Sequence, residues 1–184
     1  STTFGAKVIT AVMDPAGANV TAATMPTVTF DNIFTVTTGT AGNDTLTGTG
    51  VRDQIDGLDG DDILDGAGGD DLLNGGNGND TLTGGAGADQ INGDAGIDTA
   101  SYSGSAAGVT VSLSTGVGTG GDAQGDVLTG IENLVGSPNN DTLSGDAMDN
   151  ILDGGAGDDI IGGGAGADTL IGGPGADALD GRTN

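Results

Sequence analysis

The chain has 184 residues and a formal net charge of −24, since 27 acidic side chains face only three Lys or Arg. This charge excludes nucleic acids and anionic membranes as partners, because both need a basic protein surface, and it favours cations. No stretch approaches the roughly 18 apolar residues of a membrane span, and the absence of Cys excludes a disulfide framework.

All but one of the acidic residues are aspartates, the exception being Glu132, and 40 residues are glycines. Short carboxylates and glycines are typical of tight turns, in which Asp binds its own backbone or an ion. The sequence has no His, so it offers no Ser-His or Cys-His catalytic pair and no usual zinc site. We therefore expect a turn-rich protein that is not an enzyme.

Residues 1–38 carry no repeat. Val28, Phe30, Phe34 and Val36 share one face of an extended run, which predicts a strand. Because solenoids need capped ends, we expect this N-terminal β segment to cover the first coil of the array that follows. The alternative is a strand donated to another subunit, since the end of such an array presents an unpaired edge.

Residues 39–101 consist of seven consecutive nonapeptides, from GTAGNDTLT to GDAGIDTAS. Five more nonapeptides fill residues 136–180 of a second block, 136–184. Position 1 is Gly in all twelve units and position 4 in nine, position 6 is Asp in eleven, and position 8 is Leu or Ile in eleven. Four nearly constant columns identify a repeat protein.

Each column predicts a structural role. The glycines at positions 1 and 4 are expected to allow positive φ and close backbone approach, so that positions 1 to 6 form a tight turn with exposed carbonyls. Positions 7 to 9 form a very short strand with its central residue pointing inward. Two such units complete one coil, so the fold class is all-β, a parallel β-roll (a right-handed β-solenoid with two nonapeptides per coil). The position-8 residues then stack in two rows, Leu46, Leu64 and Leu82 in one sheet and Ile55, Leu73 and Ile91 in the other.

Residues 102–135 interrupt the repeats. The stretch VTVSL (109–113) alternates and predicts a strand, while 121–129 resembles a degenerate repeat with Asp126 at position 6 and Leu128 at position 8. We expect this connecting segment to be a bulged continuation of the roll, with a hinge as the alternative.

The predicted core is thin. One apolar side chain per nine residues cannot offset the entropy lost when nine residues are ordered. The position-6 aspartates of neighbouring coils would also stack about 5 Å apart and repel one another. The sequence therefore predicts that cations between the coils hold the turns together.

The units GGNGNDTLT and GGAGADTLI resemble the RTX (repeats-in-toxin, haemolysin-type calcium-binding) nonapeptide, G-G-x-G-x-D-x-U-x. The resemblance implies Ca²⁺ between coils, bound by position-6 carboxylates of repeats two apart and by turn carbonyls such as those of positions 2 and 4. Ca²⁺ takes six to eight oxygen ligands, which agrees with this set. The implied ligands are Asp44, Asp53, Asp62, Asp71, Asp80, Asp89, Asp98, Asp141, Asp159, Asp168 and Asp177.

Pairs of position-6 residues two repeats apart predict five sites in the first block and three in the second, hence about eight Ca²⁺ ions. Asn150 stands at position 6 and offers a neutral oxygen, so the site it shares with Asp168 should be weaker. Val51, Asn139 and Met148 replace the position-4 Gly, and Val51 and Met148 would be strained at positive φ. We expect these three turns to be poor ligands or cap-like ends.

The resemblance implies a bacterial, secreted module that folds on Ca²⁺ binding outside the cell, after type I secretion, as the non-catalytic C-terminal part of a larger protein. The alternative is a self-assembling subunit of an extracellular filament, surface layer or adhesin, located at the cell surface, whose partners would be copies of itself. Neither hypothesis involves nucleic acid or membrane insertion.

Overall fold

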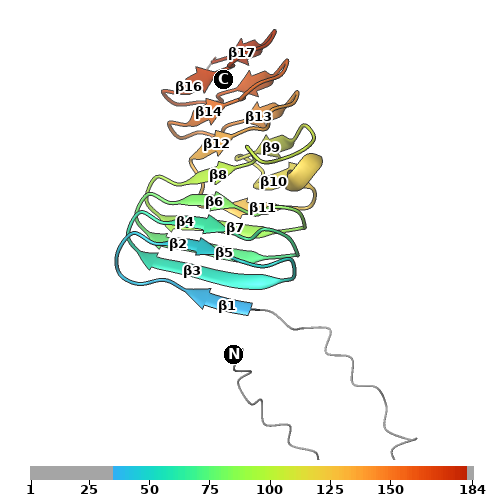
Figure 1. The fold of residues 1–184 in the computed structure, drawn as a ribbon. Helices are drawn as coiled ribbons and strands as arrows, with labels where there is room; N and C mark the ends of the chain where they lie inside the picture. Colours follow the sequence, from blue (N-terminus) through green and yellow to red (C-terminus); the bar gives the residue numbers. More distant parts are fainter. Residues whose placement is uncertain (1–34, 182–184) are drawn as a thin grey trace, which may run out of the picture. The chain divides into compact units, whose positions relative to one another are not determined.

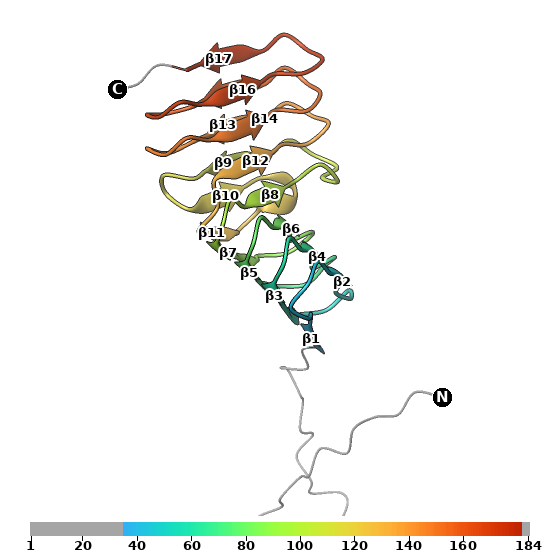
Figure 2. The ribbon, with the colours of Figure 1, turned by 90° about the vertical axis from the view of Figure 1, so that its left-hand side faces the viewer.

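The computed structural model describes residues 35–181, in which short strands stack as successive coils (Figures 1 and 2). The coils run from β1, in blue, to β17, in red, and their strands form two sheets. This arrangement confirms the predicted all-β parallel β-roll.

The larger sheet has ten strands, in the spatial order β1 (Thr35–Thr38), β3 (Asp53–Asp59), β5 (Leu72–Asn77), β7 (Gln90–Ala95), β11 (Val127–Thr129), β10 (Val117–Thr119), β9 (Thr110–Ser112), β13 (Thr142–Ser144), β15 (Ile160–Gly162) and β17 (Ala178–Asp180). The smaller sheet has seven strands, in the order β16 (Thr169–Ile171), β14 (Ile151–Asp153), β12 (Asn133–Val135), β8 (Thr99–Ser101), β6 (Thr81–Thr83), β4 (Ile63–Asp65) and β2 (Thr45–Thr47).

The strand register follows the position-8 column. Leu64 lies opposite both Leu46 and Leu82 in the smaller sheet, and Leu73 lies opposite both Ile55 and Ile91 in the larger one, as predicted. Their side chains form a narrow core that is almost entirely shielded from solvent, except for Leu46 on the first coil, which is partly buried. The core is therefore a double row of single side chains, one from each strand.

Strands β3, β5 and β7 are longer than the three residues predicted. They continue into the next repeat, where Gly76 pairs with both Leu58 and Asp94 at position 2. The expectation of very short strands holds for the smaller sheet and is wrong for these three, because pairing continues through position 2 of the following turn.

The connecting segment 102–135 belongs to the roll. Strand β11 pairs in parallel with β7, matching Leu128 to Ile91, and β12 pairs in parallel with both β8 and β14. The predicted strand in 109–113 is β9, which pairs in parallel with β13. Strand β10 is antiparallel to both β9 and β11, so a hairpin enters the larger sheet here. Strand pairing is thus continuous through this segment on both sheets.

The N-terminal strand occupies the end of the larger sheet. Strand β1 pairs in parallel with β3, and its Thr37 lies opposite Ile55. Val36 is 57% exposed, so the expectation that its apolar face covers the first coil is wrong at this residue: pairing in register turns Thr37 inward instead. Val28, Phe30 and Phe34 lie outside the described residues.

Positive φ occurs at different positions from those predicted. No glycine at position 1 has positive φ, whereas position 2 does in Leu58, Ala67 and Asp94 as well as in glycines. Position-4 glycines follow the prediction in every repeat that has one except the first, at Gly42.

Within residues 35–181, no helix is long and apolar enough to cross a membrane.

The positive φ at Leu58 (87°) yields a first prediction. A branched side chain at such an angle costs on the order of 1 kcal/mol, and Leu58 is 48% exposed, so it gains little from burial. We expect Leu58→Gly to raise the unfolding free energy at saturating calcium by about 1 kcal/mol in urea denaturation. Ile63→Gly is the matched control: it is similarly exposed but has ordinary strand geometry, and it should destabilise. A loss of stability in both variants would contradict the assignment of strain.

Candidate metal centre

The position-6 side chains lie in two columns, one along each edge of the roll. The backbone N–H of each Asp donates to Oδ1 of the Asp one coil later, as from Asp62 to Asp80 (2.8 Å) and from Asp71 to Asp89 (2.8 Å). The same bond links the other coils of both blocks, and it runs from Asp44 through Asp62 and Asp80 to Asp98 on one edge. Members of these columns that are almost completely shielded from solvent are Asp53, Asp62, Asp71, Asp80, Asp89, Asp98, Asp126, Asp141 and Asp159.

Most of these carboxylates keep one oxygen that is buried and has no hydrogen-bond partner. These atoms are Oδ1 of Asp53 and Oδ2 of Asp62, Asp71, Asp80, Asp89, Asp98, Asp159 and Asp168. A buried charged oxygen without a partner is strongly unfavourable. Their recurrence at the same position of successive repeats indicates that a cation satisfies them.

The position-1 glycines keep open the space beside these oxygens. A Cβ built on Gly66 would lie 2.5 Å from Asp71 Oδ2 and 2.5 Å from the carbonyl oxygen of Gly84 in the next coil. Glycine at position 1 therefore allows the close backbone approach that was predicted, but it does not adopt the positive φ that was also predicted. Two oxygens from neighbouring coils converge here, one carboxylate and one carbonyl, which is the mixture that Ca²⁺ binds.

Turn carbonyls supply the other oxygens at each edge. The carbonyl of Leu58, at position 2, faces Gly76 of the next coil, and the carbonyl of Gly60, at position 4, faces Gly78. Within residues 35–181, Asp, Glu, His and Cys side chains nowhere gather in a group of three or more that could hold a metal ion. An ion between two coils would therefore depend on backbone carbonyls in addition to its carboxylates.

On each edge, the first turn of a block differs from the turns that follow it, because the residue at its position 2 donates hydrogen bonds to its position-6 side chain. In the first block, Thr40 donates its N–H (2.6 Å) and hydroxyl (2.9 Å) to Asp44 Oδ2, and Thr49 does the same for Asp53. Burial alone would raise the pKa of Asp53, but hydrogen bonds from Thr49 and Thr35 lower it. The protein thus satisfies one oxygen of each of these carboxylates, while Asp53 Oδ1 stays buried without a hydrogen-bond partner.

The second block begins in the same way. Ser137 donates its N–H and hydroxyl to the carboxylate of Asp141, and the Asp146 N–H donates to Asn150 Oδ1 (2.9 Å). Asn150 also donates from Nδ2 to the Glu132 carbonyl (2.8 Å), so its amide is engaged with protein on both sides. The hydrogen bonds from position 2 were not predicted, although Thr40, Thr49, Ser137 and Asp146 all offer polar groups at position 2 of these first turns.

Val51, Asn139 and Met148 lie in these first turns. None of the three has positive φ, and Val51 and Met148 are 53% and 65% exposed. The expected strain at Val51 and Met148 is therefore wrong: a first turn has no regular preceding turn to pack against, so its backbone needs no left-handed residue at position 4.

A second column of hydrogen bonds, which sequence reasoning also missed, runs along position 5. Asn79 N–H donates to Asp61 Oδ1 (2.9 Å), and Ile97 N–H donates to Asn79 Oδ1 (2.9 Å). In this column the side chain of the earlier coil accepts from the later coil, the reverse of position 6. Asn or Asp at position 5 in seven of the twelve repeats was the available signal.

The junction between the blocks interrupts the position-6 column of one edge. Asp89 N–H donates to Asp126 Oδ1 (2.9 Å), so Asp126 takes its place in the column as the degenerate repeat suggested. Its Oδ2 accepts a hydrogen bond from the hydroxyl of the buried Tyr102 (3.0 Å). Burial and the neighbouring Asp126 raise the pKa of Tyr102, which keeps the phenol protonated and able to donate.

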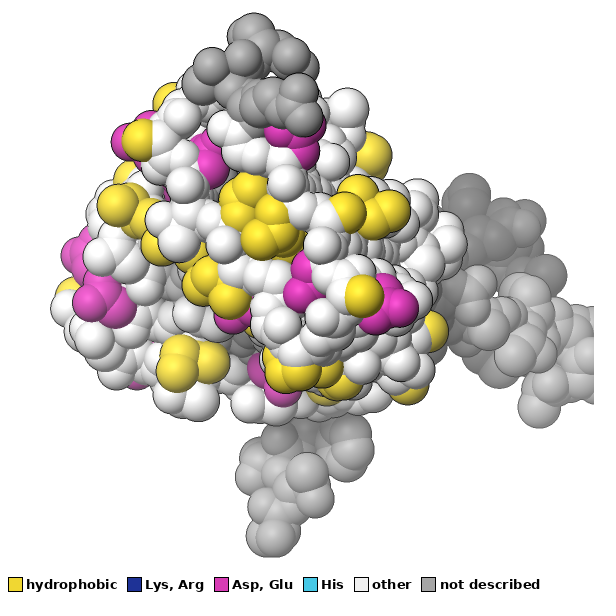
Figure 3. Space-filling view, turned by 90° about the horizontal axis from the view of Figure 1, so that it is seen from above, with side chains coloured by type: hydrophobic (Ala, Val, Ile, Leu, Met, Phe, Trp, Pro, Cys, Tyr) yellow, Lys and Arg dark blue, Asp and Glu magenta, His cyan; other side chains and the backbone are white. Residues whose placement is uncertain are grey.

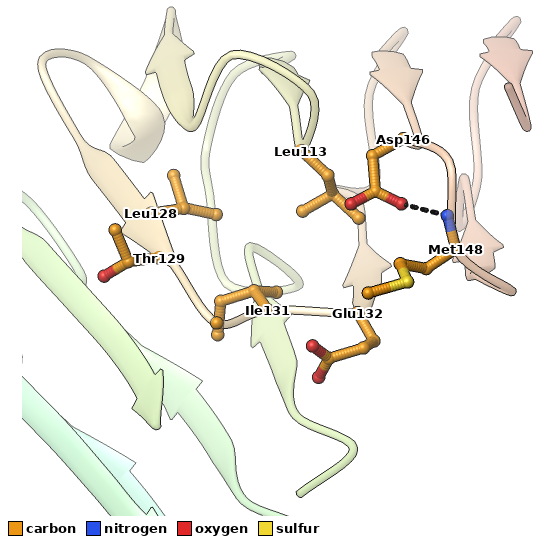
Figure 4. Close-up of a pocket in the computed structure, with 8 residues that line it drawn as sticks. Leu113, Leu128, Thr129, Ile131, Glu132, Asp146 and Met148 are labelled. Atoms are coloured by element: carbon orange, nitrogen blue, oxygen red, sulfur yellow. Dashed lines mark hydrogen bonds between the residues drawn. The ribbon is translucent and has the colours of Figure 1, made fainter. Parts of the chain in front are cut away.

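A cavity of about 240 Å³ lies beside this junction (Figure 4). Leu113, Leu128 and Ile131 contribute apolar side chains, and Asp146 accepts the N–H of Met148 (2.8 Å) at its far side. Its lining comes from three separate segments of the chain, so it marks the place where regular stacking of coils is interrupted.

Burial raises the pKa of the carboxyls inside the columns. It raises the pKa of Asp89 to about 7 and that of Asp98 to about 6. The hydrogen bond that each carboxyl accepts from a backbone N–H lowers its pKa, whereas neighbouring carboxylates raise it further. Asp71, Asp80 and Asp159 shift in the same direction for the same reason. The unpaired negative charge is thus unfavourable in the folded chain.

A proton should partly replace the cation in this arrangement. A carboxyl with a raised folded pKa penalises the folded state above that pKa, and the penalty disappears as pH falls toward the unfolded value near 4. We therefore expect the calcium-stripped chain to show more β-structure at pH 5 than at pH 8, measured by far-UV circular dichroism. Calcium should bind more weakly at pH 5, because protons compete for the same oxygens. A stronger β signal at pH 8 in the stripped chain would contradict this account.

A family model supports the site independently. The RTX calcium-binding nonapeptide repeat, represented by four copies, matches residues 38–73, 65–100, 126–161, 135–170 and 159–183. The matches cover more than half of the chain, and the third starts at Asp126, inside the connecting segment. No curated protein matches the chain.

Proposed function

The chain belongs to the family of RTX calcium-binding nonapeptide repeats, and from this premise we propose that it is an extracellular module that folds when Ca²⁺ binds. The calcium-binding repeat itself follows from family membership. The proposal adds that the module serves as the non-catalytic C-terminal part of a larger secreted bacterial protein.

The buried, unpartnered carboxylate oxygens are the observation that carries this proposal. These carboxylates have lost their hydration in the folded chain, and a cation bound between the coils would replace the lost interactions along both edges of the roll. Ca²⁺ would supply positive charge and accept several oxygens without demanding a rigid geometry. The residues that would hold it are the position-6 aspartates Asp44, Asp53, Asp62, Asp71, Asp80, Asp89, Asp98, Asp141, Asp159, Asp168 and Asp177.

These ligands would not be equal. Asp62, Asp80 and Asp89 lie inside a column with an oxygen to spare, whereas Asp44 and Asp141 already accept hydrogen bonds from position 2 of their own turns. We propose eight ions, as the spacing predicts, with the tightest sites between interior coils. Eight divalent ions would reduce the formal charge of −24 to about −8, so binding also removes the repulsion that opposes folding.

The affinity expected of such sites suits the outside of a cell. Extracellular calcium modules bind at about 10⁻⁴–10⁻³ M, far above free calcium in the cytosol. The chain would remain unfolded where it is synthesised and fold after export. The coupling of calcium binding to folding gives the module a function that requires no catalytic group.

A self-assembling structural subunit is the alternative function, and the last coil favours it. Strands β16 and β17 end the two sheets, and Ile171 and Leu179 on them are 42% and 48% exposed. Figure 3 shows apolar and acidic side chains side by side on this end of the stack. A second copy would be the occupant of this open end, through strand pairing and shared calcium.

A calcium titration tests both functions. We expect a coil-to-β change in circular dichroism at about 10⁻⁴–10⁻³ M Ca²⁺. Mg²⁺ should fail to produce it, because it requires a smaller octahedral site. Light scattering in the same titration should stay flat for a monomeric module, and a rise together with the β signal would favour the assembling subunit. Retention of the full β signal in excess chelator would refute the calcium requirement.

The column geometry also ranks individual ligands. Asp80 is buried between two coils, whereas Asp177 is half-buried and has a coil on one side only. We expect Asp80→Ala to lower the Hill coefficient of calcium-induced folding clearly more than Asp177→Ala. Asp61→Asn is the matched control, since it removes the same charge from an exposed neighbouring position outside the ligand column and keeps an acceptor for the Asn79 N–H. Equal effects of the Asp80 and Asp177 variants would count against stacked sites.

A further inference from the structure

Glu132, the sole glutamate of the chain, occupies a position-6 place in the smaller sheet. Leu134 on β12 lies opposite Ala100 on β8 and Leu152 on β14, so it is a position-8 residue by register. Glu132 precedes it by two residues, as Asp98 precedes Ala100. The column on this edge therefore continues from Asp98 through Glu132 toward the second block.

The hydrogen bond at Glu132 matches that of the regular repeats. Asp98 N–H donates to Glu132 Oε2 at 2.8 Å, the same length as the bond from Asp80 N–H to Asp98 Oδ1. The Asp98 carbonyl in turn accepts the N–H groups of Glu132 (3.1 Å) and Asn133 (2.9 Å). In Figure 4 the Glu132 carboxylate extends from its segment toward the ribbon of the first block.

The space beside Asp98 also matches. A Cβ built on Gly93 would lie 2.5 Å from Asp98 Oδ2 and in contact with the carbonyl oxygen of Gly130. Asp98 is completely buried, and its Oδ2 has no hydrogen-bond partner. A carboxylate oxygen and a carbonyl oxygen from successive coils thus converge here, as they do at Gly66.

We propose that Asp98 and Glu132 hold one further Ca²⁺ ion, at the junction of the two blocks and in addition to the eight predicted between position-6 residues. The proposal rests on the proposed calcium function. Glu132 carries its carboxylate on a side chain one methylene longer than Asp, and it reaches Asp98 although the chain between them is longer than in a regular coil. This ion joins the calcium sites of the first block to those of the second along one edge.

The opposite edge of the junction shows how a column looks when no ion is needed. There Asp126 Oδ2 accepts the hydroxyl of Tyr102, so this oxygen has a protein partner. Asp98 Oδ2 has no such donor on the Glu132 edge. The junction therefore contains one ion and one tyrosine, each closing one edge of the roll.

The test counts bound ions on the full chain by native mass spectrometry at saturating calcium. Glu132→Gln keeps an acceptor for the Asp98 N–H but loses the charge, and it should bind one ion fewer than the unchanged chain. Asp122→Asn is the matched control, since it removes one charge from the same segment outside both columns, and its count should be unchanged. An equal count for Glu132→Gln and the unchanged chain would overturn the proposal.

Two additional measurements keep the result unambiguous. The double variant Asp98→Asn/Glu132→Gln should bind as many ions as Asp98→Asn alone, because both residues bind the same ion. A lower ion count in the double variant would overturn the pairing of Asp98 with Glu132. If Glu132→Gln does not regain β-structure, the count is made on Glu132→Asp, where loss of one ion supports the proposal and an unchanged count refutes it. A chain that binds no calcium in any form would instead refute the proposed function.

Discussion

The burial of charged carboxylates along both edges of the roll is the constraint on which the rest of the structure depends. Asp62, Asp71, Asp80 and their equivalents use one oxygen to accept a backbone N–H of the preceding coil and leave the other without a protein partner. The glycine column, the converging carbonyls and the raised pKa values all follow from this arrangement. Under the proposed function, a core of one side chain per strand is sufficient because ions close the edges.

The partners of these carboxylates differ between the first turn of a block and the turns inside it. Where a block begins, Thr40, Thr49, Ser137 or Asp146 supplies hydrogen-bond donors from position 2. Inside a block, position 2 turns to positive φ and the carboxylate keeps an oxygen for an ion. Departures from the consensus repeat are therefore starts of blocks and not defective copies.

Much of this structure could be predicted from the sequence. The period of nine placed the strands, the inward Leu and Ile residues and the two aspartate columns, because a short repeat leaves few ways to stack coils. The left-handed residues were misplaced, since Leu58 and Ala67 at position 2 carry no sequence signal for positive φ. Tyr102 and Glu132 were missed as partners of the columns because their contacts depend on the path of the connecting segment, where the period is lost.

The buried phenol of Tyr102 has a practical consequence. The chain contains one tyrosine and no tryptophan, so all its absorbance and emission near 280–300 nm come from one ring at the joint between the blocks. Ultraviolet spectra of the unlabelled protein accordingly report on that single place, whereas backbone dichroism averages over every coil. The two signals can thus distinguish folding of the junction between the blocks from folding of the coils on either side.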